Sequence, residues 1–582
     1  PDDIQKYPDY SDPWGHPNTD WFKATIKPWS LQQYASVTLS GGNDRIKYFV
    51  SGGTNYEDGI FYNSATFYKQ GNFQSNLDAK ISDNIHLSAD LSGREQDNHY
   101  PGANGAGSGG GALNTWWALN RQYPYLPAYW PNGLPGPDVE YGQNPVVTTT
   151  NATGYQLDKT YILQSNLKLD INIPWVKGLS VSGNVSFDKN ILNHKQFEKP
   201  WYVYTWDGLT RDANQVPVLV KGMRGVTDAR LWQGMLDGSS TTVKGLINYQ
   251  TSIADKHNIK VLLGTERTSG DSSMFNAYRR YFTSTAIDQM FAGGNLLKDN
   301  NGAATHSSRL SYFGRLNYDY EGKYLAEFVF REDGSFIFPE GSQYGFFPGV
   351  SLGWRVSQEN FWKNNIPVVN ELKIRGSWGR TGNDRIAPYQ YAANYSYNGT
   401  YTFNQNTVVN TTNQIRTPNP NITWEVADQT NIGFDAQMFD GKISLSADYF
   451  YNKRSNILWW KNASVPGSTG LSLPQQNFAK TANQGFEFVV GYNNHIGDFT
   501  YGISFNGSYA KNKILFWDET PGIPAYQQST GHPMNSMLYY HAIGIFRDQA
   551  AVDKYPHWDG AQPGDVVFED VTGDGVKIGR AS

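Results

Sequence analysis

The feature that most constrains the fold is a strict two-residue alternation of apolar and polar side chains, repeated in long runs. From Asn72 to Lys80 every second residue is polar, and the residues between them, from Phe73 to Ile81, are mostly apolar. After the polar triplet Ser82–Asn84 the alternation restarts at Ile85. A period of two is that of a β-strand, so two such runs joined by a tight polar turn predict an antiparallel hairpin.

The length of these runs narrows the fold further. About sixteen can be counted, Thr160–Ile173 and Lys442–Asn452 among them, and many hold about 10 to 14 residues. Strands of ordinary globular proteins are about half as long, whereas a tilted strand needs about ten residues to cross a bilayer. We therefore predict membrane-crossing strands, with the apolar parity of Phe73–Ile81 toward lipid and the polar parity of Asn72–Lys80 toward a polar interior.

Short and long connections alternate along the chain. Turns such as Gly41–Arg45, Pro174–Gly178 and His495–Asp498 are short. Long extracellular loops are predicted at about residues 95–159, 189–240, 268–307, 380–423, 456–479 and 512–533. This alternation places every short turn on one rim, as in outer-membrane barrels, and a soluble sandwich or propeller gives no reason for it. The predicted fold is all-β, a large antiparallel transmembrane β-barrel region over residues 1–582.

Composition agrees with this fold and excludes several function classes. Aromatic residues make up 15% of the chain and charged residues only 17%, against about a quarter charged in typical soluble domains. Aromatic residues such as Tyr318, Tyr320 and Tyr324 stand beside short turns, as in the aromatic girdles of barrels, although Tyr and Phe are also good strand formers. A net charge of −5 gives no basic footprint for nucleic acid. With 0 cysteines, disulfides and thiolate metal sites are excluded.

Several segments together resemble the SusC/RagA family of TonB-dependent outer-membrane transporters. The four that carry most of the resemblance are Tyr312–Ser335, Tyr344–Trp362, Leu372–Asn383 and Trp424–Asp435. Three more, at Pro17–Phe22, Val37–Gly53 and Pro563–Gly575, are also similar to that family. The similar segments run nearly from end to end of the chain.

The resemblance implies a barrel of about 22 strands, filled by an N-terminal plug, in the outer membrane of a gram-negative bacterium. It implies active import of oligosaccharides, or sometimes peptides, with energy from the TonB–ExbB–ExbD system. A SusD-like surface lipoprotein and a dimer of transporter–lipoprotein pairs are implied as well. The plug, the TonB box and the last strands are expected to lie outside this sequence.

The first long loop carries the candidate substrate-binding residues. They share a flat apolar face with a polar edge, which suits the stacking of sugar rings. These residues are Trp116, Trp117, Tyr123, Tyr125, Tyr129 and Trp130. The alternative is that they pack the loop itself or contact the lid partner. The glycines of this loop lack the Gly-Lys-Ser/Thr ending of a phosphate loop.

A candidate cation site lies near the end of the sequence. Asp570, Thr572 and Asp574 offer oxygen atoms at the spacing of a calcium loop, and Gly575 occupies the sixth position. Ala581 stands where the bidentate Glu of such a loop belongs, and a plain Asp-Gly turn explains the segment equally well. A structural Ca²⁺ is therefore one interpretation, and no other cofactor is predicted.

Four classes of function remain open at this point. The first is the active importer, and the second is a passive outer-membrane pore of similar architecture. The third is an outer-membrane enzyme, but the 10 histidines show no metal-binding spacing and no nucleophile motif is present, so we predict that the protein is not an enzyme. The fourth is a soluble secreted all-β binding protein.

Overall fold

A computed structural model describes residues 2–9, 11–64, 66–102, 112–139, 143–404, 406–461, 473–570, 573 and 575. Its main element is one antiparallel sheet of 16 strands, in which neighbours in the sequence of long strands are neighbours in space. The predicted all-β class and strand number are confirmed. The strands of this sheet are β1 (Gln32–Gly42), β2 (Ile46–Asp58), β3 (Phe67–Ser82), β4 (Ile85–Pro101), β5 (Gly154–Asn172), β6 (Leu179–Glu198), β9 (Arg230–Ile253), β10 (His257–Arg280), β11 (Asp299–Tyr320), β12 (Tyr324–Ser335), β13 (Tyr344–Arg355), β14 (Val369–Asn383), β17 (Glu425–Met438), β18 (Ile443–Trp460), β19 (Gln475–Ile496) and β20 (Phe499–Phe516).

The remaining elements are short and lie in the connections. Three two-stranded hairpins form outside the main sheet: β7 (Trp201–Thr205) with β8 (Val220–Arg224), β15 (Asn394–Phe403) with β16 (Thr407–Arg416), and β21 (Ala542–Ile545) with β22 (Val566–Phe568). The α-helices are α1 (Asp2–Asp9), α2 (Trp21–Thr25), α3 (Ala112–Arg121), α4 (Pro145–Thr148), α5 (Asn360–Asn365) and α6 (Gln549–Lys554). Among the described residues, no helix combines the length and the apolar character that a membrane span needs.

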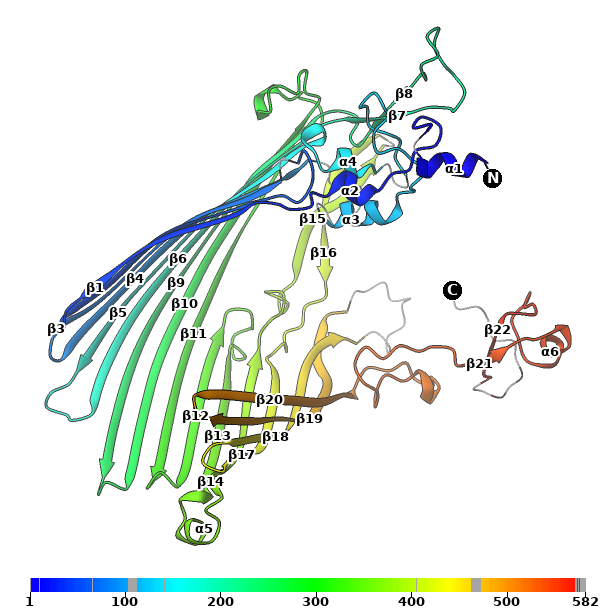
Figure 1. Cartoon of the computed structure of the whole chain (residues 1–582). Helices are drawn as coiled ribbons and strands as arrows, with labels where there is room; N and C mark the ends of the chain where they lie inside the picture. The colour runs from blue at the N-terminus through cyan, green and yellow to red at the C-terminus, as the bar shows by residue number, and fades with distance from the viewer. Residues whose placement is uncertain are drawn as a thin grey trace. The chain divides into compact units, whose positions relative to one another are not determined.

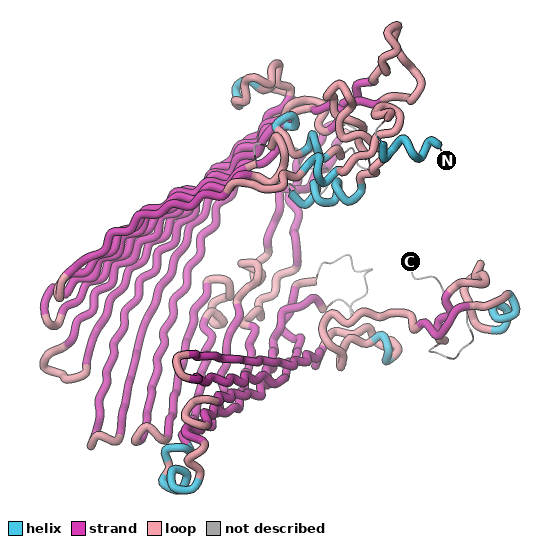
Figure 2. The backbone as a smooth tube through the Cα atoms, viewed as in Figure 1, coloured by secondary structure: helices cyan, strands magenta, loops and turns pink. Residues whose placement is uncertain are grey.

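The chain divides into two compact units within β12. Unit 1 holds residues 1–321 and 327–336, and unit 2 holds residues 322–326 and 337–582. In unit 1 the long strands lie side by side, and α2, α3 and α4 gather at the end where the long loops emerge (Figure 1). In unit 2, α5 lies at the short-turn end of β14 (Figures 1 and 2).

The two faces of the sheet in unit 1 differ in the way the alternation predicts. One polar residue from each of six neighbouring strands lies in a single row, and we call the face that carries it the polar face. The row is Asn76, Asp90, Asn166, Ser186, Thr242 and Thr268. Its members are hydrogen-bonded across strands: Asn76 Nδ2 donates to Asp90 Oδ1 at 2.6 Å, and Ser186 Oγ donates to Asn166 Oδ1 at 2.9 Å. Phe73 and Leu77 lie on the opposite, exposed apolar face.

Unit 2 repeats this division with a charged network on its polar face. Arg375 of β14 donates to Asp435 of β17 at 3.0 Å and also reaches Asp448 of β18, with its Nη2 2.6 Å from Asp448 Oδ2. Gly433 makes the second contact feasible, because a Cβ atom at this position would lie 2.4 Å from Asp448 Oδ1. The guanidinium of β14 therefore binds carboxylates of both β17 and β18. It can pass over β17 because Gly433 has no side chain at the crossing point.

The strands extend well into the predicted loops. β9 and β10 contain 24 residues each, so the loop predicted at 268–307 is only 281–298. The other connections also shorten, from 95–159 to 102–153, from 189–240 to 199–229, from 380–423 to 384–424 and from 456–479 to 461–474, and the last loop begins at 517 instead of 512. Strand pairing continues where both faces are polar, as in Thr268–Ser273, and there the alternation that marks a strand is lost.

Candidate functional site

The long loops of unit 1 fold into a small subdomain with its own core. Buried residues from α2, α3, α4 and β7 pack together where these elements gather (Figure 1). They are Trp21, Leu119, Ala128, Val146, Val147, Trp201 and Val203. Asn144 is fully buried and fixes the local backbone, because it caps α4 through Val146 N at 3.1 Å and donates to Gly136 O at 2.9 Å. The candidate aromatic residues are therefore carried on a packed support.

Trp130 belongs to the interior of this subdomain. Its side chain is only 6% exposed, and it stacks on Trp14 with 5.5 Å between ring centroids. Its indole Nε1 donates to Tyr204 O at 2.8 Å, and Trp206 meets it edge-on at 6.4 Å. Both the ring and its one polar atom are thus occupied, so the geometry gives Trp130 the packing role that the sequence left open.

Four of the other aromatic residues are exposed, and the Arg121 guanidinium lies over the Trp117 ring, 5.8 Å from its centroid. Trp116 and Trp117 lie on α3, with 39% and 55% of their surface exposed. Tyr123 and Tyr125 stack on each other with centroids 5.2 Å apart and planes 6° apart, and both remain exposed. Tyr129 is intermediate, because its hydroxyl donates to Val146 O at 3.3 Å, and burial raises its pKa.

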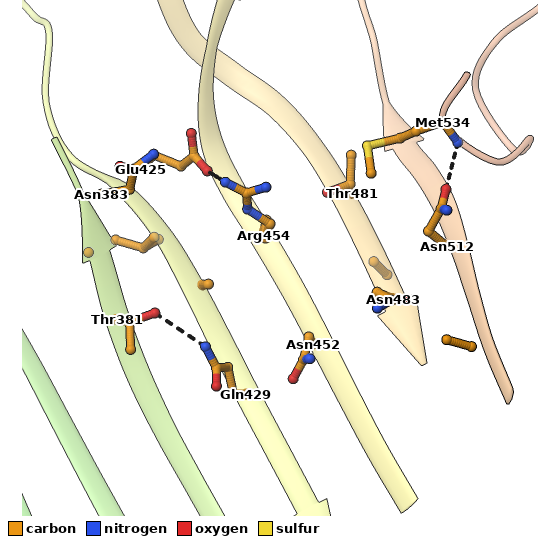
Figure 3. Close-up of a pocket in the computed structure, with 15 residues that line it drawn as sticks. Thr381, Asn383, Glu425, Gln429, Asn452, Arg454, Thr481, Asn483, Asn512 and Met534 are labelled. Atoms are coloured by element: carbon orange, nitrogen blue, oxygen red, sulfur yellow. Dashed lines mark hydrogen bonds and ion pairs between the residues drawn. The ribbon is translucent and has the colours of Figure 1, made fainter. Parts of the chain in front are cut away.

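A polar pocket opens on unit 2, near the ends of the strands that lead to the long loops. Figure 3 shows it lined by side chains from β14, β17, β18, β19 and β20 together with Met534. Its cavity volume is ≈ 540 Å³, within the usual range for small-molecule sites. The polar face of the sheet forms its floor, since the lining residues Gln429, Asn452 and Asn483 share the face of Arg375.

Carboxamides dominate this pocket, and four of them form one row across four adjacent strands. The register pairs Gln429 with Asn452, Asn452 with Asn483, and Asn483 with Asn512 (Figure 3). We call this set the amide row. Gln429 donates to Thr381 Oγ1 at 3.4 Å, and Asn512 Oδ1 accepts from Met534 N at 2.6 Å.

The two central carboxamides of the amide row are available to a ligand. Within the described parts of β14 and β17–β20, neither Asn452 nor Asn483 has a hydrogen-bond partner for its side chain, although both are half-buried. Each carboxamide offers donors and an acceptor, and adjacent strands are about 4.8 Å apart. The row therefore presents carboxamide donors and acceptors at a regular spacing.

The surroundings of the amide row are neutral overall. Glu425 and Arg454 form an ion pair with each other at the pocket rim (Figure 3). Phe450 lies on the same face, one step along β18 from Asn452, and its ring covers Gly485, where an added Cβ would lie 2.8 Å from Phe450 Cζ. A ring beside a row of amides suits a neutral ligand that has both apolar faces and hydroxyl or amide groups.

The predicted cation loop is only partly described. Thr572 and Asp574 lie outside the described residues. The Asp570 carboxylate accepts from Gly573 N and Gly575 N, each at 2.9 Å, as in an Asp-Gly turn. Among the residues that the structure describes, no three His, Cys, Asp or Glu side chains are grouped so that they could hold a metal ion.

Sequence reasoning did not find the amide row. Each of its members occupies the polar parity of its own strand, and polar residues at that parity occur in every strand of the sheet. The row results from the pairing register of the strands, which places four residues side by side although they are spread over more than eighty positions of the sequence. They are Gln429, Asn452, Asn483 and Asn512. Strand pairing from a structure was needed to see it.

The antiparallel sheet, with one apolar and one polar face and loops at one end, defines the class of large β-barrels. The family model described as "TonB dependent receptor-like, beta-barrel" matches residues 104–558. The chain therefore belongs to this family.

Individual relatives agree with this assignment. The chain is 26% identical over 582 residues to TonB-dependent receptor P3 of Formosa agariphila, covering 96% of this chain and 54% of that protein. It is 27% identical over 288 residues to TonB-dependent receptor SusC of Bacteroides thetaiotaomicron, covering 48% of this chain and 28% of that protein. The RagAB peptide importer in its 'open-open' state has the same fold, with a TM-score of 0.77 at 18% identity over 100% of this chain and 61% of that chain. The chain spans about half the length of TonB-dependent receptor P3.

Proposed function

We propose that this chain is the barrel region of an active importer that carries nutrients across the outer membrane of a gram-negative bacterium. The observation that carries the proposal is a sheet of this receptor family whose polar face bears a pocket with unpaired carboxamides at Asn452 and Asn483. On this proposal the apolar face, with Phe73, Leu77 and Ile432 exposed, contacts lipid. The long loops then face the medium.

Oligosaccharides are the proposed cargo. The amide row offers regularly spaced donors and acceptors to hydroxyl groups, and Phe450 offers a ring face beside it. On the loop subdomain, Trp116, Trp117 and the stacked pair Tyr123 and Tyr125 are further exposed aromatic side chains that a glycan can contact. A peptide is the competing cargo, because the RagAB peptide importer has the same fold.

The proposed partners are a SusD-like lipoprotein and the TonB–ExbB–ExbD system. Coupling to TonB is supported by the family, which is that of TonB-dependent receptor-like barrels, and by the similarity to TonB-dependent receptor SusC. On this proposal the lipoprotein covers the loops of the barrel, and transporter–lipoprotein pairs assemble as dimers.

The test is uptake by cells that express the complete protein. Radiolabelled oligosaccharide fractions are offered to cells with and without its gene, and to cells that lack TonB. Active import predicts accumulation that disappears in both deletion strains and after addition of a protonophore. Uptake that persists without TonB and follows the external concentration contradicts the proposal and identifies a passive pore, which purified protein would then show as steady conductance in planar bilayers.

A further inference from the structure

A second group of ligand-type side chains lies on the polar face of unit 1, where β6, β9 and β10 reach the long loops. Glu198, Arg230 and Arg280 stand side by side in register, each at the end of its strand. The short turns lie at the opposite ends of these strands, some 20 residues away. A bilayer occupies only about ten residues of a strand, so this group stands outside the membrane-spanning part.

The two arginines of this row differ in what they bind. Arg280 is satisfied: its Nε lies 2.9 Å from Asp228 Oδ2, and its Nη2 also contacts that carboxylate. Arg230 is not, because its Nε is buried without a hydrogen-bond partner, and within the described residues its guanidinium forms no ion pair. A buried donor that the protein leaves unpaired is costly, and no carboxylate of the described residues offsets that cost for Arg230.

Glu198 is the carboxylate nearest in register, and the protein does not use it to neutralise Arg230. The two described side chains form no ion pair, and Glu198 Oε1 instead accepts from Gln196 Nε2 at 2.9 Å. Burial raises the pKa of Glu198, and the charge of Arg230 opposes that effect. Arg230 is left as the available cation of this row.

Two aromatic rings adjoin Arg230 on the polar face. One step further along the strands, Trp232 and Tyr278 lie in register, with ring centroids 4.3 Å apart and planes at 37°. Gly234 follows Trp232 on the same face, and Gly154 pairs with Glu198 at the other side of the row. At both glycines the neighbouring strand packs closely, since an added Cβ would lie 2.9 Å from Phe275 O at Gly234 and 1.9 Å from Phe197 O at Gly154.

We propose that Arg230, together with Trp232 and Tyr278, forms a binding subsite for a carboxylate-bearing ligand. The guanidinium fork matches a carboxylate, to which it donates two parallel hydrogen bonds, and the two rings hold the apolar part of the same ligand. The inference rests on the proposed import function and adds a substrate property to it. A sugar acid and the C-terminus of a peptide present the same group, so the experiment distinguishes these two sources.

The test measures binding to the complete transporter in detergent by isothermal titration calorimetry. Four probes are compared: a trigalacturonate, a neutral trigalactoside, an acetylated tripeptide with a free carboxylate, and the amide of that tripeptide. The variant is Arg230→Gln. The matched control is Arg94→Gln, since Arg94 is an exposed arginine on the polar face of β4, away from the aromatic pair.

We expect the wild type to prefer one carboxylate probe over its neutral counterpart by about tenfold or more, the size of a hydrogen bond to a charged group. Arg230→Gln should abolish this preference, Arg230→Lys should retain part of it, and Arg94→Gln should leave it unchanged. Which carboxylate probe is preferred identifies sugar acid or peptide. A wild type that binds neither carboxylate probe preferentially, or an Arg230→Gln variant that keeps the preference, overturns the subsite. Unchanged heat-modified mobility in gels confirms that the variants are folded.

Failure of the subsite and failure of the import function give different results. If import is correct and the subsite is wrong, TonB-dependent uptake persists while Arg230→Gln leaves probe discrimination unaltered. If import is wrong, uptake is independent of TonB in the wild type as well.

Discussion

Replacing Trp130 separates the packing role of the loop aromatics from a ligand-binding role. Trp130 is 6% exposed, stacks on Trp14, and donates from Nε1 to Tyr204 O at 2.8 Å. Trp117 is 55% exposed on α3 of the same subdomain. The same substitution, Trp to Ala, at the two positions is therefore expected to give opposite outcomes.

The magnitude for Trp130→Ala follows from its contacts. Removing a buried Trp costs about 3–5 kcal/mol, and Tyr204 O loses a hydrogen bond worth about 1 kcal/mol. Taking about 3 kcal/mol as a lower value, the opening equilibrium of the subdomain shifts by about a hundredfold, because 1.4 kcal/mol corresponds to a factor of ten. The long strands are held by their own ladders and should be unaffected.

Amide hydrogen exchange of the complete protein in detergent measures this shift. The amides of Trp130 and Gly133, which donate to Leu134 O and Trp130 O at 2.8 Å each, should lose about two powers of ten in protection in Trp130→Ala. Trp117→Ala should keep their protection and instead weaken oligosaccharide binding. Equal exchange in both variants would refute the reasoning, since it would mean that Trp130 does not hold the subdomain together.

Three further predictions concern the polar faces and the loop contacts. Arg375→Gln leaves the carboxylates of Asp435 and Asp448 facing each other and should destabilise the barrel by about 2 kcal/mol. The measurement is the unfolding temperature in detergent, which should fall; an unchanged temperature would show that this charged network does not stabilise the sheet. Arg280 lowers the pKa of Asp228. Their contact therefore stabilises the loop fully above the ordinary carboxyl pKa of about 4, and this stabilisation is lost as the pH falls through the lowered pKa. Asp228→Asn should speed amide exchange at Tyr281 at pH 7 but match the wild type in strong acid, and equal effects at both pH values would exclude the linkage. Asn483→Ala should weaken neutral oligosaccharide binding by about fivefold and Gln484→Ala, one residue along β19 on the other face, should not; calorimetry in which both variants behave alike would remove the amide row from the site.

Alternation predicted the strands well where one face is apolar and poorly where both are polar. The run from Phe73 to Ile81 shows the rule, because its apolar residues lie on the exposed face and its polar residues on the hydrogen-bonded face. The middle of β10 shows the exception, since Thr268–Ser273 holds no apolar side chain, only polar residues and Gly270, and still pairs on both sides. Backbone hydrogen bonds hold such a stretch in the sheet without any pattern in its side chains.

The candidate site was predictable only in its local parts. The aromatic residues of the first long loop could be picked out by type, but their exposure could not, because the burial of Trp130 depends on Trp14, more than a hundred residues away. The unpaired Arg230 gave no sequence signal at all. Its lack of a partner follows from two other contacts, because Glu198 of β6 accepts from Gln196 and the Asp228 carboxylate, just before β9, pairs with Arg280 of β10.

The length of β9 and β10 has a consequence for anything anchored beside this barrel. Of the 24 residues in each strand, a bilayer occupies about ten, and the remaining fourteen or so extend about 45 Å along the strand, or about 30 Å in height at a tilt of about 45°. If the proposed lipoprotein keeps its acyl chains in the outer leaflet, it must span that height before its folded part can reach the loops. Fully extended chain covers about 3.4 Å per residue, so its lipidated tether needs about nine residues or more, and a shorter tether would hold the partner below the rim of the barrel.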